Sequence, residues 1–311
     1  MSAVPAIQAC HITKRYGALL AVEDLSLEVH SGEVFGLLGP NGAGKTTSIN
    51  ILCGLLKPDA GEVLIHGKAI TNGDAGLRHK VGVCPQNITL WNTLTCLEQM
   101  QFVGELYGLK GKALRVASLG LLQSLDLEEK KDSLARTLSG GMQRRLNLAL
   151  ALVHDPEILV LDEPEAGLDP QSRVLVREYI KSLAHRKTII LTTHNMDEAE
   201  RLADRVAIID RGRLLMVDSP EALKQRVGEG DVLEFEVSAN VETALNVLRP
   251  LVREVTAEDH TICLKALGMV ERLPAILETL RQVDVFPAEV RLRSTSLEDV
   301  FISLTGRRLR E

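Results

Sequence analysis

Nine consecutive residues have the types and spacing of a phosphate-binding loop. Glycines at the first, fourth and sixth positions let the backbone curl, so that successive N–H groups converge on one anion. The lysine at the seventh position supplies a positive charge for the β and γ phosphates of a nucleotide, and the next threonine offers a hydroxyl to Mg²⁺. The loop comprises Gly39, Pro40, Asn41, Gly42, Ala43, Gly44, Lys45, Thr46 and Thr47. The sequence therefore predicts a site for a nucleotide and Mg²⁺.

The segments on either side favour phosphate binding over the alternative, a glycine turn at the start of a helix. Residues 34–38 form a short apolar run that is typical of a buried strand, and residues 47–56 have helical apolar spacing. A strand, this loop and a helix in that order place the positive end of the helix dipole at the bound anion.

Two carboxylates follow a second apolar run. Residues 158–161 are apolar, and Asp162 and Glu163 come directly after them. Because ligands of parallel α/β sheets bind at the carboxyl ends of strands, we expect Asp162 to hold the Mg²⁺ shell and Glu163 to polarise an attacking water. The alternative is a solvated acidic pair at a strand end, which the phosphate loop upstream disfavours.

Composition indicates a globular protein. The 311 residues are 45% hydrophobic and 25% charged, with a formal net charge of −6, so the length allows one large domain and a smaller one. Nucleic-acid binding is not indicated, because the chain has no basic block and no aromatic cluster of the RNA-binding kind.

The apolar runs and the cysteines of the sequence indicate the cellular compartment of the chain. No stretch approaches the roughly 18 uninterrupted apolar residues of a membrane span, and residues 1–10 lack a secretory pattern. The five cysteines are scattered without metal-type spacing, which indicates reduced thiols. They are Cys10, Cys53, Cys84, Cys96 and Cys263. We expect a cytoplasmic chain that does not itself enter or cross a membrane.

Hydrophobic periodicity divides the chain into a larger α/β part and a smaller α+β part. Residues 6–30 alternate as antiparallel strands, residues 95–138 have helical spacing, and strand and helix alternate again over residues 158–210. Such alternation predicts a parallel core sheet covered by helices. The predicted domains are residues 5–228, with a helical subdomain at about 88–155, and residues 229–311.

A further motif, Leu-Ser-Gly-Gly-Met-Gln at residues 138–143, completes a resemblance to the ATP-binding subunits of ABC transporters over residues 7–217. The resemblance implies the P-loop NTPase fold and ATP hydrolysis. In that family this signature segment contacts the γ phosphate of a nucleotide held by another copy, and here it begins a helix, a second anion site. The signature residues expected at the nucleotide are Ser139, Gly140, Gly141 and Gln143.

The resemblance assigns roles to four more residues. Tyr16 corresponds to the aromatic residue that stacks on adenine, although a half-buried structural tyrosine is the alternative. Gln86 contacts Mg²⁺ and the water, Asp169 belongs to the loop through which the two sites communicate, and His194 reaches the γ phosphate. The expected catalytic residues are Glu163, His194, Lys45 and Gln86, and the expected metal ligands are Thr46, Gln86 and Asp162.

One departure from the family is Glu165, where relatives usually carry serine or threonine. We expect its negative charge to act on the neighbouring Glu163 or to alter contacts within a dimer.

The resemblance also implies partners. Each composite site takes its phosphate loop from one chain and its signature from another, so a homodimer that drives a separate membrane permease is expected. Residues 87–100, with the single Trp91, are the expected docking surface, and a core role for Trp91 is the alternative. Residues 229–311 are interpreted as a dimerisation or regulatory module, because they lack a catalytic or metal-binding constellation.

Three motifs narrow the resemblance to the multidrug and daunorubicin-resistance exporter ATPases: residues 102–109, 142–145 and 296–306. They favour an exporter of drugs, lipids or other amphipathic cargo. The alternatives are a soluble ABC ATPase without a transport role, and a nucleotide-gated regulatory switch. The first is disfavoured because the chain has no coiled-coil insertion, tandem ATPase domain or zinc-type cysteine pairs, and the second because Glu163 and His194 are both present.

Overall fold

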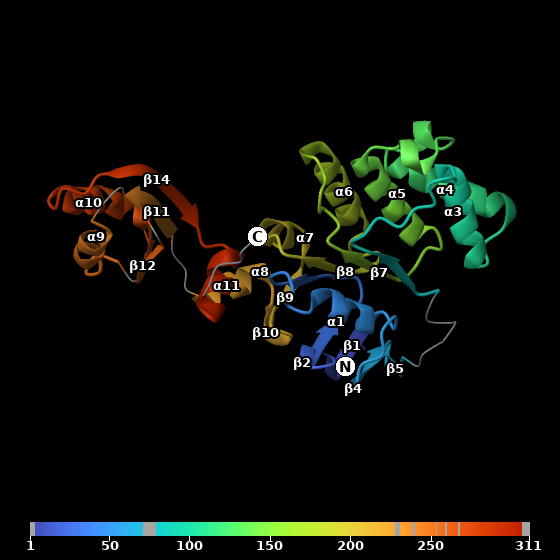
Figure 1. The fold of residues 1–311 in the computed structure, drawn as a ribbon, viewed down its shortest axis with the longest axis horizontal. Coiled ribbons are helices and arrows are strands. Elements are labelled where there is room, and N and C mark those ends of the chain that lie inside the picture. Colours follow the sequence, from blue (N-terminus) through green and yellow to red (C-terminus); the bar gives the residue numbers. More distant parts are fainter. Residues whose placement is uncertain are drawn as a thin grey trace. The chain divides into compact units, whose positions relative to one another are not determined.

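The structure is a computed structural model that describes residues 4–70, 79–227, 231–237, 240–252, 254–258, 260–266 and 268–306 (Figure 1). The chain divides into two compact units, one up to Pro220 and one from Glu221. The boundary expected between residues 228 and 229 falls outside the described residues, and the domain ranges 5–228 and 229–311 therefore stay predictions.

A four-stranded antiparallel sheet, in the order β2-β1-β4-β5, forms one layer of the first unit. Its strands are β1 (Ile7–Tyr16), β2 (Leu19–Val29), β4 (Ala60–Ile65) and β5 (Lys68–Ala69). The apolar residues of β1 and β2 alternate with polar ones, so that one face of this sheet is buried and packs toward helix α1 (Lys45–Leu52). The predicted antiparallel strands at residues 6–30 are confirmed.

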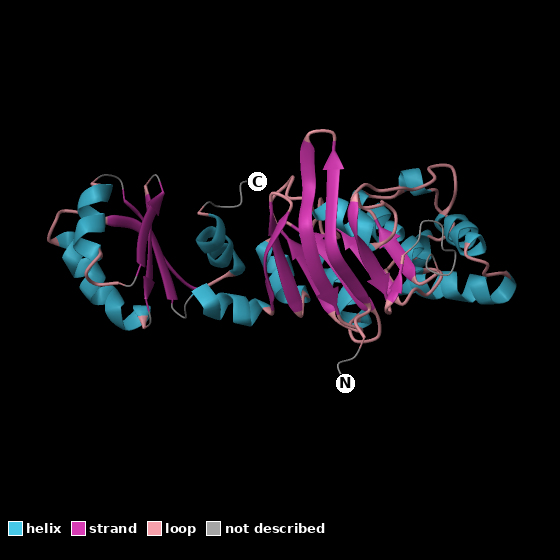
Figure 2. Ribbon diagram, turned by 90° about the horizontal axis from the view of Figure 1, so that it is seen from below, coloured by secondary structure: helices cyan, strands magenta, loops and turns pink. Residues whose placement is uncertain are grey.

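A six-stranded sheet in the order β10-β9-β3-β8-β7-β6 forms the core (Figure 2). Its strands are β3 (Val34–Leu38), β6 (Val81–Cys84), β7 (Ile158–Asp162), β8 (Thr188–Thr193), β9 (Arg205–Asp210) and β10 (Arg213–Asp218). All neighbours are parallel except β10, which runs antiparallel to β9. The predicted parallel core is confirmed, and the antiparallel edge strand β10 was not predicted.

The two faces of the six-stranded sheet pack into two separate hydrophobic cores. Leu159 and Leu161 of β7 face the helical side, whereas Ile158 and Val160 face α1 and the antiparallel sheet. The helical subdomain contains α3 (Cys96–Leu106), α4 (Gly111–Ser124) and α5 (Gly140–Leu152). Three more helices follow along the chain: α6 (Pro170–Leu183), α7 (Met196–Leu202) and α8 (Pro220–Val227). Both faces of the parallel strands are covered, as their continuous apolar runs require.

The second unit is an antiparallel sheet in the order β12-β13-β11-β14 with two helices on one face (Figure 2). The strands are β11 (Asp231–Val237), β12 (Glu254–Glu258), β13 (Thr261–Ala266) and β14 (Pro287–Ser294). The covering helices are α9 (Val241–Leu248) and α10 (Met269–Arg281), and α11 (Leu297–Thr305) follows β14. The unit has its own hydrophobic core, and its α+β character agrees with the prediction.

Among the described residues, no helix is both long and apolar enough to span a bilayer.

Candidate functional site

Backbone geometry explains the glycines of the phosphate loop, which joins β3 to α1. A Cβ on Gly39 would lie 2.2 Å from the carbonyl oxygen of Ile209, and one on Gly44 would lie 2.4 Å from that of Ala21. Gly44 also has φ 99°, in the left-handed region. The first turn of α1 carries no acidic residue, and no side chain caps it. Its free N–H groups and the helix dipole therefore favour an anion at this end.

Lys45 places its ammonium at the same point. Its Nζ donates to the carbonyl oxygens of Gly39 (2.7 Å) and Pro40 (3.3 Å), and it lies 3.5 Å from Oε1 of Glu163. Burial lowers the pKa of Lys45, and the negative charge of Glu163 opposes this effect. The loop thus holds a buried positive charge beside the free end of α1.

Asp162 connects the phosphate loop to two strands. Its Oδ2 accepts a hydrogen bond from Oγ1 of Thr46 (3.2 Å), and its Oδ1 accepts one from Thr192. Among the described residues, no group of three or more His, Cys, Asp or Glu side chains could hold a metal ion. A hydroxyl and a carboxylate that converge on one point suit Mg²⁺, which commonly takes few protein oxygens and completes its shell with phosphate and water.

Glu163 occupies a strained position between Lys45 and His194. Its φ of 51° is in the left-handed region, which is unfavourable for glutamate, and its N–H is held by the carbonyl and the hydroxyl of Thr192, both at 3.1 Å. Its Oε2 lies 2.8 Å from Nδ1 of His194. Three of the four residues that we expected to be catalytic are therefore in direct contact, while the side chain of Gln86 is exposed at the end of β6.

In the sequence, Arg144 stands out only as part of the motif at residues 142–145, and its place in the site was not predicted. This buried residue, in the second turn of α5, donates to carbonyl oxygens and makes no ion pair among the described residues. Its bonds reach Pro85 (2.7 Å), Gln86 (2.8 Å), Asp162 (2.7 Å), Glu163 (2.5 Å) and Pro164 (3.2 Å). The signal that could have found it is an arginine just before the largely apolar second half of the helix, where it falls on the buried side.

The signature residues are fixed against their own chain. Oγ of Ser139 caps α5 by accepting from the N–H of Met142 (3.3 Å), and Gly141 lies so close to Ser172 that an added Cβ would be 2.4 Å from its hydroxyl. The amide of Gln143 donates to carbonyl oxygens of the loop before α5. Among the described residues, none of the signature's hydrogen bonds reaches residues 39–47 of the phosphate loop.

Asp169 and Tyr16 lie at the margins of the site. Asp169 caps α6 by accepting from the N–H of Ser172 (3.0 Å), and this hydrogen bond lowers the pKa of Asp169. Tyr16 is exposed at the end of β1, where Nζ of Lys14 lies 5.9 Å from the ring centroid. The exposed ring can accept a planar base, and its stacking role stays a prediction.

Glu165 does not present the free charge that its sequence position suggested. It is buried, and its carboxylate accepts two hydrogen bonds from Arg177 of α6, at 2.8 and 2.6 Å. A further buried acid nearby is Glu198 of α7, which accepts from Thr193 (2.5 Å) and has one oxygen without a partner among the residues that the structure describes. Burial raises the pKa of Glu198 to about 8, the Thr193 hydroxyl opposes the change, and the charges of Glu165 and Glu163 add to it.

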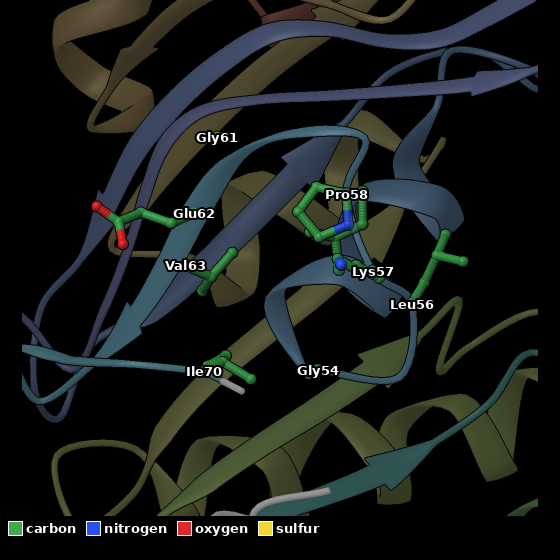
Figure 3. Close-up of a pocket in the computed structure, with 9 residues that line it drawn as sticks. Gly54, Leu56, Lys57, Pro58, Gly61, Glu62, Val63 and Ile70 are labelled. Atoms are coloured by element: carbon green, nitrogen blue, oxygen red, sulfur yellow. The ribbon is translucent and has the colours of Figure 1, made fainter. Parts of the chain in front are cut away.

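A separate cavity of about 340 Å³ opens at the other end of α1 (Figure 3). Its lining is mainly apolar and includes Lys57 and Glu62. None of the expected site residues lines this cavity, so it is distinct from the phosphate loop.

Comparison with known proteins agrees with this geometry. A family model described as ABC transporter matches residues 22–166. The Nod factor export ATP-binding protein I of Ralstonia nicotianae is 41% identical over 100% of this chain and 97% of its own length. The linearmycin resistance ATP-binding protein of Bacillus subtilis is 36% identical over 98% of this chain and 100% of its own length.

Solved structures resemble a smaller part of this chain than the relatives do. A dimeric bacterial ABC transporter cassette is 29% identical with a TM-score of 0.63, covering 68% of this chain and 98% of that one. The ADP conformation of another ABC transporter cassette is 27% identical with a TM-score of 0.64, covering 70% of this chain and 92% of that one. The fold, the site and the full-length relatives agree, and this chain belongs to the ABC transporter ATP-binding proteins, a family of ATPases.

Proposed function

We propose that two copies of this chain close around two ATP–Mg²⁺ and that hydrolysis drives export through a separate membrane permease. The observation that carries this proposal is the convergence of Glu163, Lys45 and His194 beside the free end of α1. A carboxylate, a cation and an imidazole at an anion site are the groups that phosphoryl transfer to water needs.

Each residue has a defined part in the reaction. Lys45 turns from the carbonyls of its loop to the β and γ phosphates, and Glu163 accepts a proton from the water that attacks the γ phosphorus. The bond between the γ phosphorus and the bridging oxygen breaks, and ADP and phosphate result. His194, 2.8 Å from Glu163, orients that carboxylate and contacts the γ phosphate.

Thr46, Asp162 and Gln86 are the residues that would hold Mg²⁺, which supplies charge neutralisation at the phosphates. Oγ1 of Thr46 and Oδ2 of Asp162 are 3.2 Å apart, and the backbone of Gln86 is fixed by Arg144. The side chain of Gln86 is exposed, and we propose that it turns inward when nucleotide binds.

The arrangement of the signature supports a dimer. Gly141 lies against Ser172 of α6 in the same chain and Ser139 caps α5, whereas the phosphate loop lies at the carboxyl end of β3. We propose that the signature of one copy contacts the nucleotide of the other, since both halves of the site are intact. One of the solved cassettes that this chain resembles is dimeric.

Export is proposed from the relatives and from an exposed aromatic pair. The name of one relative specifies Nod factor export and that of another linearmycin resistance, and the first of these names is the ground for proposing export. Trp91 and Phe102 form an edge-on pair, 5.1 Å between ring centroids, and both are partly exposed. We propose that this pair contacts a permease at the cytoplasmic face of the membrane.

Glu163→Gln tests the proposal, because the amide cannot accept the proton of water while the geometry is kept. ATPase activity should fall at least about a hundredfold, and the variant should form a stable dimer with ATP and Mg²⁺ in size-exclusion chromatography. Glu178→Gln, an exposed glutamate on α6, is the matched control. Unchanged turnover in Glu163→Gln would refute the role of Glu163. Recovery of a multi-span protein with the tagged chain from solubilised membranes tests the permease separately.

A further inference from the structure

The sheet of the second unit ends in a strand with an open edge. β14 lies at one end of the order β12-β13-β11-β14, and among the described strands it pairs only with β11 (Figure 1). Six of its eight residues are exposed. The outer edge therefore presents N–H and C=O groups that another strand could satisfy.

One face of β14 continues the hydrophobic core beyond the covering helices. Val290 lies opposite Phe235 and Leu292 lies opposite Leu233, and these two β11 residues are buried in the core formed with α9 and α10. Val290 and Leu292 are nevertheless 39% and 42% exposed, and Phe286, just before the strand, is 64% exposed. An apolar strip thus reaches the open edge.

The other face of β14 carries charges of both signs. Glu289 and Arg291 pair with each other two residues apart, at 2.9 and 3.0 Å, and both are exposed. Arg293 is already bound to Glu234 and Asp299. Glu289 and Arg291 are therefore the charges that an added strand would meet.

We propose that β14 pairs antiparallel with β14 of a second copy of this chain, with the twofold axis at Val290. In this register Val290 lies opposite Val290 of the second copy, Glu289 lies opposite Arg291 of the second copy, and Ala288 lies opposite Leu292 of the second copy. Apolar residues then meet on one face and opposite charges on the other.

Other symmetric registers fit the sequence less well. An axis at Arg291 opposes two guanidinium groups, and an axis at Glu289 opposes two carboxylates. An axis between neighbouring residues is excluded, because opposed residues share a face whereas neighbours along a strand lie on opposite faces. The order of residues in β14 therefore favours one register.

We assign the partner strand to a second copy of this chain. This inference rests on the proposed function, in which two chains share ATP. Pairing of the nucleotide-binding units confines two β14 edges within one complex, and this raises their effective concentration. One strand pair is smaller than a standard interface of roughly 1,600 Å². The edge contact is therefore weak by itself and is strengthened when ATP closes the dimer.

Cysteine crosslinking of the full-length chain tests the pairing. Val290→Cys, treated with a short bis-maleimide that adds one cysteine thiol at each end, should give a covalent dimer at least about fivefold above the wild-type background from the native cysteines, and more with ATP and Mg²⁺ than without. Arg291→Cys should crosslink less. In the Val290→Cys background, Glu289→Arg or Arg291→Glu should lower the yield, and the double exchange Glu289→Arg/Arg291→Glu should restore it.

Crosslinking of Val290→Cys at the wild-type level, stronger crosslinking of Arg291→Cys, or no recovery in the double exchange would overturn the inference. A separate measurement, the ATP-dependent dimerisation of Glu163→Gln in size-exclusion chromatography, reports on the proposed function. Loss of that dimer with retained crosslinking at Val290 would count against the shared ATP sites and leave the strand pairing intact. A β14 variant that keeps the ATP-dependent dimer but loses crosslinking is the result expected for separate contacts.

Discussion

Glu165 and Arg177 form an ion pair that is largely withdrawn from water, between the loop after β7 and the helix α6. Removing one partner of such a pair leaves an uncompensated charge, whereas removing both can be almost neutral. Glu165→Ser should therefore lower the free energy of unfolding by about 2–3 kcal/mol. Glu165→Ser/Arg177→Leu should recover at least half of this loss in urea unfolding.

Arg173 provides the control for this cycle, because it is more exposed and lies 3.8 Å from Glu165. Arg173→Gln should change the free energy of unfolding by less than about 1 kcal/mol. Additive effects of the Glu165 and Arg177 substitutions would show that the pair has no coupling energy.

Glu198 gives the protein a dependence on pH. Its pKa is raised from 4.5 to about 8 by burial, with the charges of Glu165 and Glu163 adding to the shift, and Arg177 favours the charged form. The native state therefore keeps a proton that the unfolded state releases, so the free energy of unfolding falls as pH rises from about 4.5 to about 8. Glu198→Gln keeps the contact with Thr193 and cannot ionise.

The expected result is that Glu198→Gln and wild type differ little near pH 5 and that the variant becomes the more stable protein toward pH 8. The difference should reach a few kcal/mol, since each pKa unit corresponds to about 1.4 kcal/mol. Urea unfolding at a series of pH values measures it. Parallel pH profiles for the two proteins would contradict the assignment.

At the level of single residues, the sequence allowed prediction of the site residues that directly follow an apolar strand along the chain. The phosphate loop, Asp162 and Glu163 follow apolar strands, and a strand end fixes where the next side chain can point. The partner of Glu165 could not be predicted, because Arg177 is twelve residues away and meets it only through the packing of α6. The carbonyl contacts of Arg144 likewise join segments that are brought together only by the fold.

Among the elements, α3 carries Phe102, one member of the aromatic pair that we assign to the permease. Trp91 lies before the helix, its N–H backbone group donates to Gln99, and its ring meets Phe102 edge-on. The 44% exposure of Trp91 favours a surface role over the core alternative. Capping of α3 by Thr95 and Glu98 fixes the start of the helix and hence the place of Phe102.

Trp91→Ala should leave basal ATPase activity within about twofold of wild type and lower transport about tenfold, because exposed aromatic anchors dominate many interfaces. ATPase assays on the purified chain and transport assays with the permease present measure the two effects. Tyr179→Phe, on α6, is a control that should change neither. Loss of ATP binding in Trp91→Ala would contradict a docking role.

Periodicity located most elements but not their order in the sheets. The apolar spacing of residues 241–248 is helical and corresponds to α9, and the alternation over residues 285–292 corresponds to β14. β10 and β12 were missed because short edge strands have weak patterns. The position of β14 at the edge depends on long-range pairing that a local pattern does not encode.

At the scale of the whole molecule, two units with separate hydrophobic cores should separate without loss of the first fold. A chain that ends at Val227 should bind ATP with an affinity within about threefold of the full chain, because every expected nucleotide ligand lies before this point. Its ATP-dependent self-association should be weaker than that of the full chain. Circular dichroism and analytical ultracentrifugation provide the measurements, and equal self-association of both chains would contradict the assigned role of the second unit.

Arg144 has a mechanical consequence for the cycle. Five residues after Ser139 along α5, one guanidinium is bonded to the backbone at the carboxyl ends of the two neighbouring strands β6 and β7. At 1.5 Å of rise per residue this spacing is less than 10 Å. In the proposed dimer, a displacement of the signature by the nucleotide of the other copy would be passed by Arg144 to the backbone of Gln86 and Glu163. The residue that steadies these backbone groups would thereby link nucleotide binding in one copy to the position of the Glu163 carboxylate in the other.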